Sequence, residues 1–518
     1  MTCEGRSKRG ESILRRPGTR DSIPLRARYA RRVTRRFGWA LGGIVLAAAA
    51  LRLFRLDHFS YGLDEILQGY MIQGDWKSFW GSLKFDAVHP PLDYLIARGV
   101  EAFGPPDWGR KLPAVLWGVG TVAVLGGLIT RRVGRAAGLT AAAFLAFAPF
   151  HVRYSQEFRP YSLGLFLMCL SLLALDAFLA RPATLRLAAL FLACLATAYA
   201  LYLAAFALAI AAAALLVEDA FDRDTERRRA ARRFLLWSPA FVAALWVAYL
   251  PWWPVAVEAA RRAPPVSAEP LTGQRIGRTL SFFAFAPADG EPIRRGTILF
   301  WALVAIGTWL AARRSRHRFL LAWAALALTG IEILGQLHPH WYSTRRFLPA
   351  GLAIVALAGL SIGELLRRPV ARLAAASVLV VIIVLDLRSL TRYFRDGRAD
   401  WRTLADFLRR EAPPAERIFT ENQYSELCVA FYLEGPLWLR TGGHLGRDIW
   451  NLEGQIVRLT WSWHAGKTAW LVLAGEPRHE PLRRWAAAFP CRPFPSAEGA
   501  LLCRLDPALR EKALGPGR

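Results

Sequence analysis

An adjacent pair of acidic residues, Asp64-Glu65, follows the first long apolar run of the chain. A carboxylate can take a proton from a hydroxyl group, but a charge at a membrane surface is costly unless it is solvated or paired. The segment His89-Pro90-Pro91-Leu92 comes later in the same stretch. The acidic pair is therefore the first candidate for catalysis, as a base that activates a hydroxyl.

Each of these residues also has a structural interpretation. Asp64 and Glu65 could cap a surface helix, because acidic side chains stabilise the positive end of a helix. His89 precedes two prolines that stop or kink a helix, so it could be a hydrogen-bonded structural histidine as well as a substrate contact.

Composition indicates the elements that must position these residues. The chain has 518 residues, of which 54% are hydrophobic, and its mean hydropathy is +0.24. Its apolar runs have the length that crosses a hydrocarbon core of roughly 30 Å. We expect helices over 37–55, 112–130, 136–150, 161–180, 187–200, 201–217, 234–254, 297–312, 319–337, 347–363 and 373–388. This pattern predicts an α-helical polytopic membrane protein with about eleven transmembrane helices, or ten if 187–217 is one tilted helix.

Basic residues in short loops predict the topology, because Lys and Arg accumulate on the cytoplasmic side. With the N-terminus inside, every inside loop is basic: 131–135, 181–186, 218–233, 313–318 and 367–372. The Arg-rich residues 1–36 are expected to be a disordered cytoplasmic tail in contact with membrane lipid. The formal charge of +27 is concentrated in this tail and these loops, so we expect no nucleic-acid partner. The excess of Arg over Lys and the abundance of Ala indicate a GC-rich bacterial genome, so we expect the bacterial inner (plasma) membrane.

The pattern changes near residue 389, where long apolar runs end. Residues 401–408 are typical of an amphipathic helix, and 417–420 and 469–474 of strands. We therefore expect a small soluble α/β domain over 389–518, outside the membrane. Cys491 and Cys503 could form a disulfide there, with Cys428 as a competing partner.

On this topology the polar residues gather on the outside face. The long first outside loop, 56–111, holds Asp64, Glu65, Asp86, His89 and Asp93, and its length fits two surface-lying or re-entrant helices. Two further outside loops are 151–161 and 338–349. Their candidate residues are Arg153, Glu157, Arg159, Tyr161, Arg345 and Arg346.

Carboxylates and arginines on one face suit an enzyme that uses a lipid-phosphate donor. The carboxylate would activate an acceptor hydroxyl, and arginine would hold the leaving phosphate, since its planar fork grips phosphate oxygens and never loses its charge. Arg153 and Glu157 are four residues apart, however, and could simply form a helical ion pair.

The order of these motifs resembles the protein mannosyltransferase and aminoarabinose transferase superfamily of C-class, polyprenyl-phosphate-dependent glycosyltransferases. The resemblance rests on Asp64-Glu65, His89-Pro90-Pro91-Leu92, the segment 155–161 and Arg346-Phe347-Leu348-Pro349, and covers most of residues 37–390. It implies an inverting transfer of a sugar to an acceptor hydroxyl on the extracytoplasmic face.

By position, the resemblance makes Asp64 the general base, with Glu65 orienting the acceptor or sharing that role. Arg159, with Arg153 as second choice, would stabilise charge on the lipid phosphate. The acceptor could be a lipid, a polysaccharide or a protein. No cofactor is certain; a divalent metal is possible, either at the adjacent carboxylates or at His338 and His340.

Two other classes compete with the enzyme. A polytopic transporter or lipid flippase also needs many helices, but it predicts charges within them, and Glu332 is the main one here. A non-catalytic scaffold would use the outside domain to bind partners.

Overall fold

The structure of this chain is a computed structural model. It describes residues 25–262, 272–284, 295–337, 343–396, 400–412, 416–421, 423–434, 449–451, 468–473, 491–493 and 501–505. Residues 1–24, His338 and His340 lie outside these ranges.

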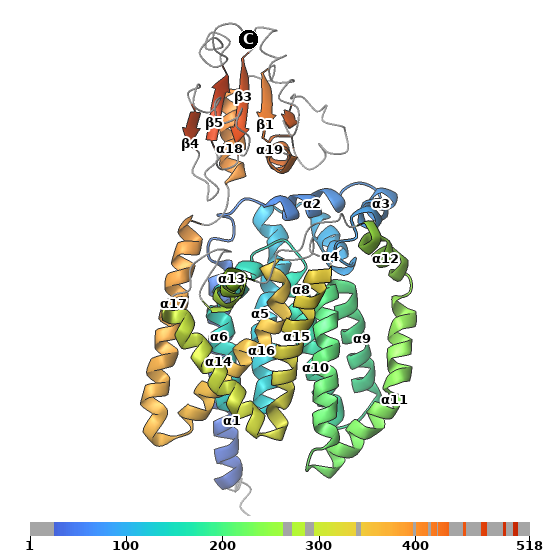
Figure 1. Ribbon diagram of the computed structural model, residues 1–518, viewed down its shortest axis with the longest axis vertical. Coiled ribbons are helices and arrows are strands. Elements are labelled where there is room, and N and C mark those ends of the chain that lie inside the picture. The colour runs from blue at the N-terminus through green and yellow to red at the C-terminus, as the bar shows by residue number, and fades with distance from the viewer. Residues whose placement is uncertain are drawn as a thin grey trace, which may run out of the picture.

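A bundle of long helices forms the main body (Figure 1). Its helices are α1 Leu25–Leu53, α5 Asp107–Arg132, α6 Arg135–Phe147, α7 Pro149–Ser155, α8 Tyr161–Ala180, α9 Thr184–Ala200, α10 Tyr202–Ala220, α11 Thr225–Tyr249, α12 Trp253–Arg262, α13 Gly273–Ala284, α14 Arg295–Arg313, α15 Arg318–Leu337, α16 Leu348–Leu366 and α17 Arg372–Asp396. The apolar runs of the sequence fall on these helices. Within the described residues, eight helices are long and apolar enough to cross a membrane, or up to ten if each of two bent pairs is one span. The shorter α9 accounts for the eleventh predicted run.

Three breaks divide the apolar runs. The run 187–217 is two helices, α9 and α10, separated by the extended Leu201. A Cβ on Gly164 would lie 2.6 Å from the Leu201 Cβ, so the missing side chain at Gly164 makes room for this break. The run 136–150 bends by 63° before Pro149, and 234–254 bends by 76° between α11 and α12.

The first helix begins earlier than the sequence predicted. Helix α1 starts at Leu25, so residues 25–36 are helical and not part of a disordered tail. Arginine and alanine are good helix formers, which lets a membrane helix continue into its basic flank.

The first outside loop contains three helices and not the two predicted. They are α2 Leu63–Met71, α3 Trp76–Asp86 and α4 Leu92–Glu101. Asp75 caps α3 by accepting a hydrogen bond from the Ser78 amide at 2.8 Å. In Figure 1, α2 and α3 lie across one end of the bundle. The next predicted outside loop, 151–161, is also partly helical, because the buried helix α7 occupies its first half.

Helix α16 lies at the centre of the bundle and is buried from Leu348 to Gly363. It approaches α6 closely through Gly359 and Gly363, where added Cβ atoms would lie 2.7 Å and 2.5 Å from the amide nitrogens of Ala141 and Ala137. Small residues four apart let two helix backbones approach in this way.

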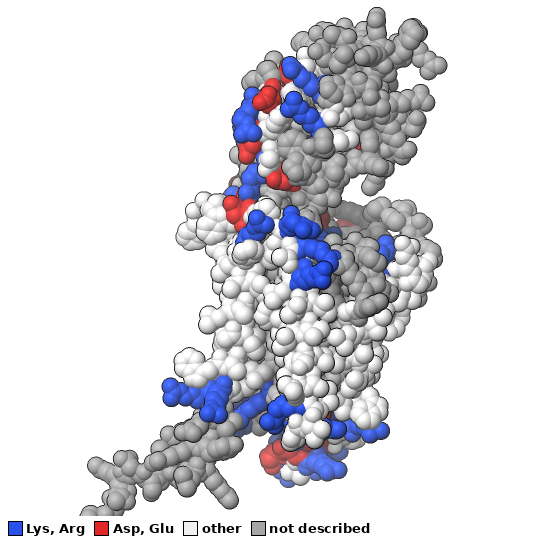
Figure 2. Space-filling view, turned by 90° about the vertical axis from the view of Figure 1, so that its left-hand side faces the viewer, with Lys and Arg blue, Asp and Glu red and all other residues white. Residues whose placement is uncertain are grey.

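The opposite end of the bundle is held together by ion pairs. Arg132 pairs with Asp219 at 2.7 Å and with Glu218 at 2.5 Å, and Arg131 pairs with Asp176 at 2.6 Å. These contacts join α5, α8 and α10 at the end where the sequence placed the basic inside loops. Figure 2 shows basic residues at this lower end and a mostly uncharged surface above it.

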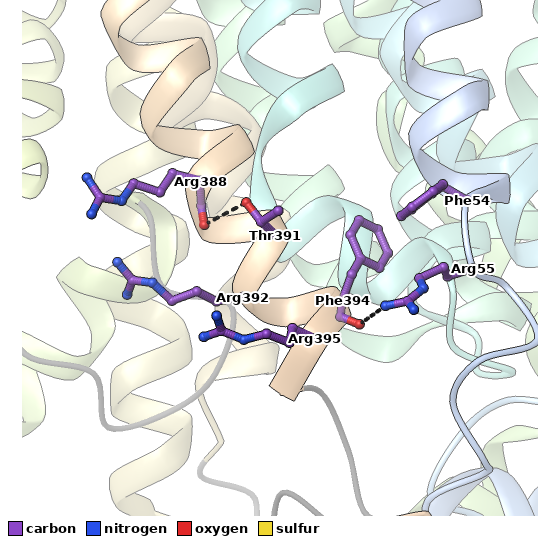
Figure 3. Close-up of a pocket in the computed structure, with 7 residues that line it drawn as sticks. All are labelled: Phe54, Arg55, Arg388, Thr391, Arg392, Phe394 and Arg395. Atoms are coloured by element: carbon purple, nitrogen blue, oxygen red, sulfur yellow. Dashed lines mark hydrogen bonds between the residues drawn. The ribbon is translucent and has the colours of Figure 1, made fainter.

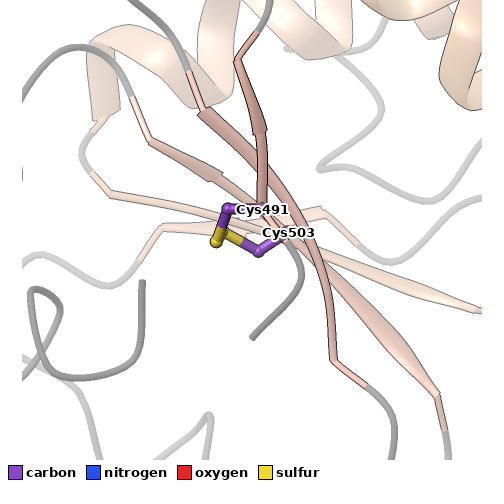
Figure 4. Close-up of a disulfide and its surroundings, with 2 residues drawn as sticks. All are labelled: Cys491 and Cys503. Atoms are coloured by element: carbon purple, nitrogen blue, oxygen red, sulfur yellow. A yellow bond between two sulfur atoms is a disulfide. The ribbon is translucent and has the colours of Figure 1, made fainter. Parts of the chain in front are cut away.

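The C-terminal domain contains one mixed sheet, as the α/β prediction required. Its elements are α18 Trp401–Glu411, β1 Arg417–Thr420, α19 Gln423–Glu434, β2 Ile449–Asn451, β3 Ala469–Leu473, β4 Cys491–Pro493 and β5 Leu501–Leu505. The strand order is β2-β1-β3-β5-β4, with β1 parallel to β2 and β3 and the remaining pairs antiparallel. Cys491 and Cys503 are opposite each other on β4 and β5 and form a disulfide (Figure 4), whereas Cys428 is a buried free cysteine.

This domain packs on α2. The Phe431 ring of α19 lies 5.6 Å from the Tyr70 ring and 5.8 Å from the Tyr61 ring. The Tyr432 hydroxyl accepts a hydrogen bond from the Tyr61 amide at 2.6 Å, and Arg402 pairs with Asp107 at 3.0 Å. The domain therefore holds the element that carries the acidic pair.

Candidate active site

Asp64 lies in the first turn of α2 and forms an ion pair with Arg345. Arg345 belongs to the short 3-10 helix Thr344–Phe347, which enters α16. The Asp64 side chain is 36% exposed, so a substrate can reach its carboxylate. Partial burial opposes its ionisation, but the charges of Arg159, Arg345 and Arg346 outweigh burial and lower the pKa of Asp64 below its ordinary value.

Arg159 connects α2 to the segment between α7 and α8. Its Nη1 donates to the Asp64 carbonyl oxygen at 2.8 Å and is 3.4 Å from the Gln68 Oε1. The residue is 6% exposed. Arg159 therefore acts on the Asp64 carboxylate through its charge, while this hydrogen bond fixes the backbone of Asp64.

Glu65 accepts hydrogen bonds from two backbone amides. Its Oε2 accepts from Gly62 at 3.0 Å, which caps α2, and its Oε1 accepts from Phe158 at 2.8 Å. The residue is 2% exposed. The two interpretations of the acidic pair therefore apply to different residues. Glu65 makes the contacts expected of a helix cap, whereas Asp64 faces the arginines, as expected of a catalytic residue.

His89 lies between α3 and α4, with its ring centroid 5.7 Å from that of Tyr161. It is 8% exposed, and its Nδ1 has no hydrogen-bond partner in the described part of the chain. Burial, followed by the charges of Arg159, Arg345 and Arg346, lowers the pKa of His89 well below its ordinary value. The neutral imidazole thus faces the same arginines as Asp64.

The sequence analysis counted Asp93 among the acids of the loop but gave it no role, and it did not single out Gln68. The Gln68 Nε2 donates to the Asp93 Oδ2 at 2.8 Å. Burial raises the pKa of Asp93 to about 6, although the Gln68 hydrogen bond and the Arg159 charge oppose this. Helical spacing in the sequence could have identified Asp93, because Asp93 and Ala97 are four residues apart and share the buried face of α4.

The remaining candidates are Tyr161, Arg153, Glu157 and Arg346, and Tyr161 and Glu157 interact electrostatically with Arg345. Its guanidinium lies 5.8 Å from the Tyr161 ring centroid. Arg153 and Glu157 form the predicted i,i+4 ion pair at 3.4 Å. Arg346 lies beside Arg345 and contributes to the electrostatics of both Asp64 and His89.

The described residues contain no group of three or more His, Cys, Asp and Glu side chains that could hold a metal ion. The predicted pair His338 and His340 lies outside them. Glu332, the charged residue that would favour a transporter, forms an ion pair with Arg275 at 2.6 Å.

Part of the sequence and the fold as a whole are similar to known proteins. Residues 88–253 match the family model described as dolichyl-phosphate-mannose-protein mannosyltransferase. The fold is similar to that of ArnT from Cupriavidus metallidurans in the apo state, with a TM-score of 0.55 and 16% identity over 91% of this chain and 98% of that one. The same protein bound to undecaprenyl phosphate matches with a TM-score of 0.53 and 16% identity, over 90% of this chain and 98% of that one. The curated proteins include no match.

The long apolar helices and the ArnT-like fold define an integral membrane protein with the architecture of C-class glycosyltransferases. The family-model match and the ArnT-like fold confirm that the chain resembles the protein mannosyltransferase and aminoarabinose transferase superfamily.

Proposed function

We propose that this protein transfers a sugar from a polyprenyl-phosphate donor to an acceptor hydroxyl, at the end of the bundle that carries α2. The observation that supports this proposal most directly is the Asp64 carboxylate surrounded by three arginines from two distant segments. The family-model match to mannosyltransferases and the undecaprenyl phosphate bound by ArnT support the donor class.

In this reaction the acceptor oxygen attacks the anomeric carbon of the sugar while Asp64 takes the hydroxyl proton. The bond between the anomeric carbon and the phosphate oxygen breaks, and its electron pair leaves with the lipid phosphate. Attack opposite the leaving group inverts the anomeric configuration. The phosphate leaves as an anion, so it requires cations and no proton donor.

The sequence favoured Arg159 and then Arg153 for the lipid phosphate. We now assign it first to Arg345, whose side chain is 35% exposed, and to the adjacent Arg346, because Arg159 is only 6% exposed. A phosphate that binds Arg345 competes with the Asp64 carboxylate for the same guanidinium. Donor binding would therefore release Asp64, and the loss of the ion pair would raise its pKa toward that of an effective base.

The other residues have supporting roles in this proposal. Glu65 positions Asp64 by fixing the start of α2 and joining it to Phe158. Neutral His89 and Tyr161 contact the donor, and Glu157 orients Arg153. The active end is proposed to face away from the cytoplasm, because the basic loops lie at the opposite end.

The Asp64→Asn variant tests the proposal. It keeps the size of the side chain but cannot accept the hydroxyl proton, so transfer should fall by roughly 100-fold or more. The measurement is release of labelled sugar from a panel of polyprenyl-phosphate donors by the protein purified in detergent. Asp57→Asn, an exposed acid before the same helix, is the matched control and should retain transfer. Full transfer by a folded Asp64→Asn variant would overturn the assignment of the base.

A further inference from the structure

A second basic site lies away from Asp64, where the end of α1 meets the end of α17. Seven residues line a cavity of about 450 Å³ there: Phe54, Arg55, Arg388, Thr391, Arg392, Phe394 and Arg395. Four of these seven lining residues are arginines, and none of the seven is acidic. Figure 3 shows the side chains of Arg388, Arg392 and Arg395 extending in one direction from α17.

The inner wall of this cavity is well defined. The Phe54 and Phe394 rings meet edge to face at 5.0 Å, and the Arg55 Nη1 donates to the Phe394 carbonyl oxygen at 2.8 Å. Behind them, Phe394 and Tyr393 belong to a small buried cluster with Phe59 and Val152. Because α1 is tied to α17 in this way, one wall of the pocket is fixed.

The face of helix α17 that leads to the pocket changes from apolar to basic residues toward its C-terminal end. Val384 and Val381 lie about one and two turns before Arg388 on that face, and they are 55% and 47% exposed. Residues three, four and seven apart share a face of a helix, so this apolar stripe continues directly into Arg388, Arg392 and Arg395. An apolar stripe that ends in cations matches the chemistry of an acidic lipid.

The position of these arginines is unusual. They lie at the end of the bundle that carries α2, opposite the basic loops that satisfy the positive-inside pattern. Simple anchoring at the cytoplasmic surface therefore does not account for them. Arginine binds phosphate with parallel N–H donors, so the three arginines that extend in one direction from α17 suit a phosphate group.

We propose that this pocket binds the phosphate headgroup of an anionic glycerophospholipid, with an acyl chain along the apolar stripe of α17. None of its lining residues belongs to the Asp64 site, so this proposal does not depend on the proposed sugar transfer. The stripe favours a lipid over free phosphate, because inorganic phosphate has no part that would cover Val381 and Val384.

The test uses the full chain in nanodiscs made from phosphatidylcholine, with or without phosphatidylglycerol. Native mass spectrometry of protein released from the nanodiscs counts the retained phosphatidylglycerol. The triple variant Arg388→Gln, Arg392→Gln, Arg395→Gln should retain at most about one tenth as much of this lipid as the wild-type protein. The matched control removes three arginines at the other end, as Arg186→Gln, Arg313→Gln, Arg368→Gln, and should retain the lipid.

Three results would overturn the proposal. They are equal retention by both triple variants, displacement of the lipid by millimolar inorganic phosphate, and preferential retention of polyprenyl phosphate when both lipids are offered. The charge-conserving variant Arg388→Lys, Arg392→Lys, Arg395→Lys separates charge from folding, and it should recover part of the binding. Sugar release measured on the same samples should be unaffected by whether the pocket is filled.

Discussion

At the scale of single residues, the candidate site separates two carboxylates that adjoin each other in sequence. Asp64 is partly exposed and paired with a distant arginine, whereas Glu65 is buried and bound to backbone amides. A helix places consecutive side chains about 100° apart, so neighbours meet different surroundings. One of them can therefore react with substrate while the other positions it.

Asp93 gives a prediction at this scale. Its pKa of about 6 lies above the ordinary value of 3.8, so the folded protein binds this proton more tightly than the unfolded chain does. The contribution of Asp93 to stability, about 3 kcal/mol, is therefore full below pH 3.8 and is lost as pH rises through about 6.

The Asp93→Asn variant cannot titrate at this position and should lose this part of the pH dependence. The measurement compares thermal unfolding at pH 5 and pH 7.5 for the wild-type protein and the variant in one detergent. Asp57→Asn serves as the control and should keep the wild-type difference. An unchanged difference in Asp93→Asn would show that another group causes it.

At the scale of elements, the close contact between α6 and α16 lies in the core of the bundle and stabilises it. Added Cβ atoms at Gly359 and Gly363 would approach backbone atoms of α6, which cannot move aside as a flexible side chain can. Helix α16 also leads directly from the segment of Arg345 and Arg346. Separation of these helices would therefore displace the proposed phosphate-binding residues.

Gly363→Ala is expected to destabilise the protein by about 1–3 kcal/mol, because overpacking forces the two backbones apart. Gly127→Ala in α5 is the matched control, since its added methyl group would have no neighbour within 4 Å. It should be neutral or slightly stabilising, because alanine favours a helix over glycine. Thermal unfolding in detergent measures both, and equal unfolding temperatures would contradict the prediction.

At the scale of the whole molecule, the sheet domain and the candidate site share one end of the bundle. Helix α19 packs against α2, so the domain supports the helix that carries Asp64. The sequence predicted the domain over 389–518 as a separate soluble unit. In the structure, α17 runs to Asp396, and α18 begins at Trp401, whose amide donates to the Ser60 Oγ at 3.0 Å.

The topology can be tested by labelling single cysteines. With Cys3, Cys169, Cys194 and Cys428 replaced by alanine, Arg410→Cys in α18 should react with a membrane-impermeant maleimide added to intact cells. Arg368→Cys, between α16 and α17, should react only after lysis, because basic loops stay in the cytoplasm. The opposite pattern would place the candidate site inside the cell.

The sequence by itself determined where the long apolar helices lie and which of their connecting loops are basic. A hydrocarbon core requires long apolar runs, so helix positions follow from local composition. The motifs also identified most candidate residues, including Asp64, Arg159 and Arg345, because charged residues in the outside loops depart from the positive-inside pattern.

Only the tertiary structure decided which of these residues meet. Asp64 and Arg345 are 281 positions apart, and Asp93 reaches Gln68 from another helix. The three helices of the first loop and the docking of α19 on α2 also depend on contacts between distant segments. Such contacts depend on how packed elements fit together, and local periodicity carries no information about that fit.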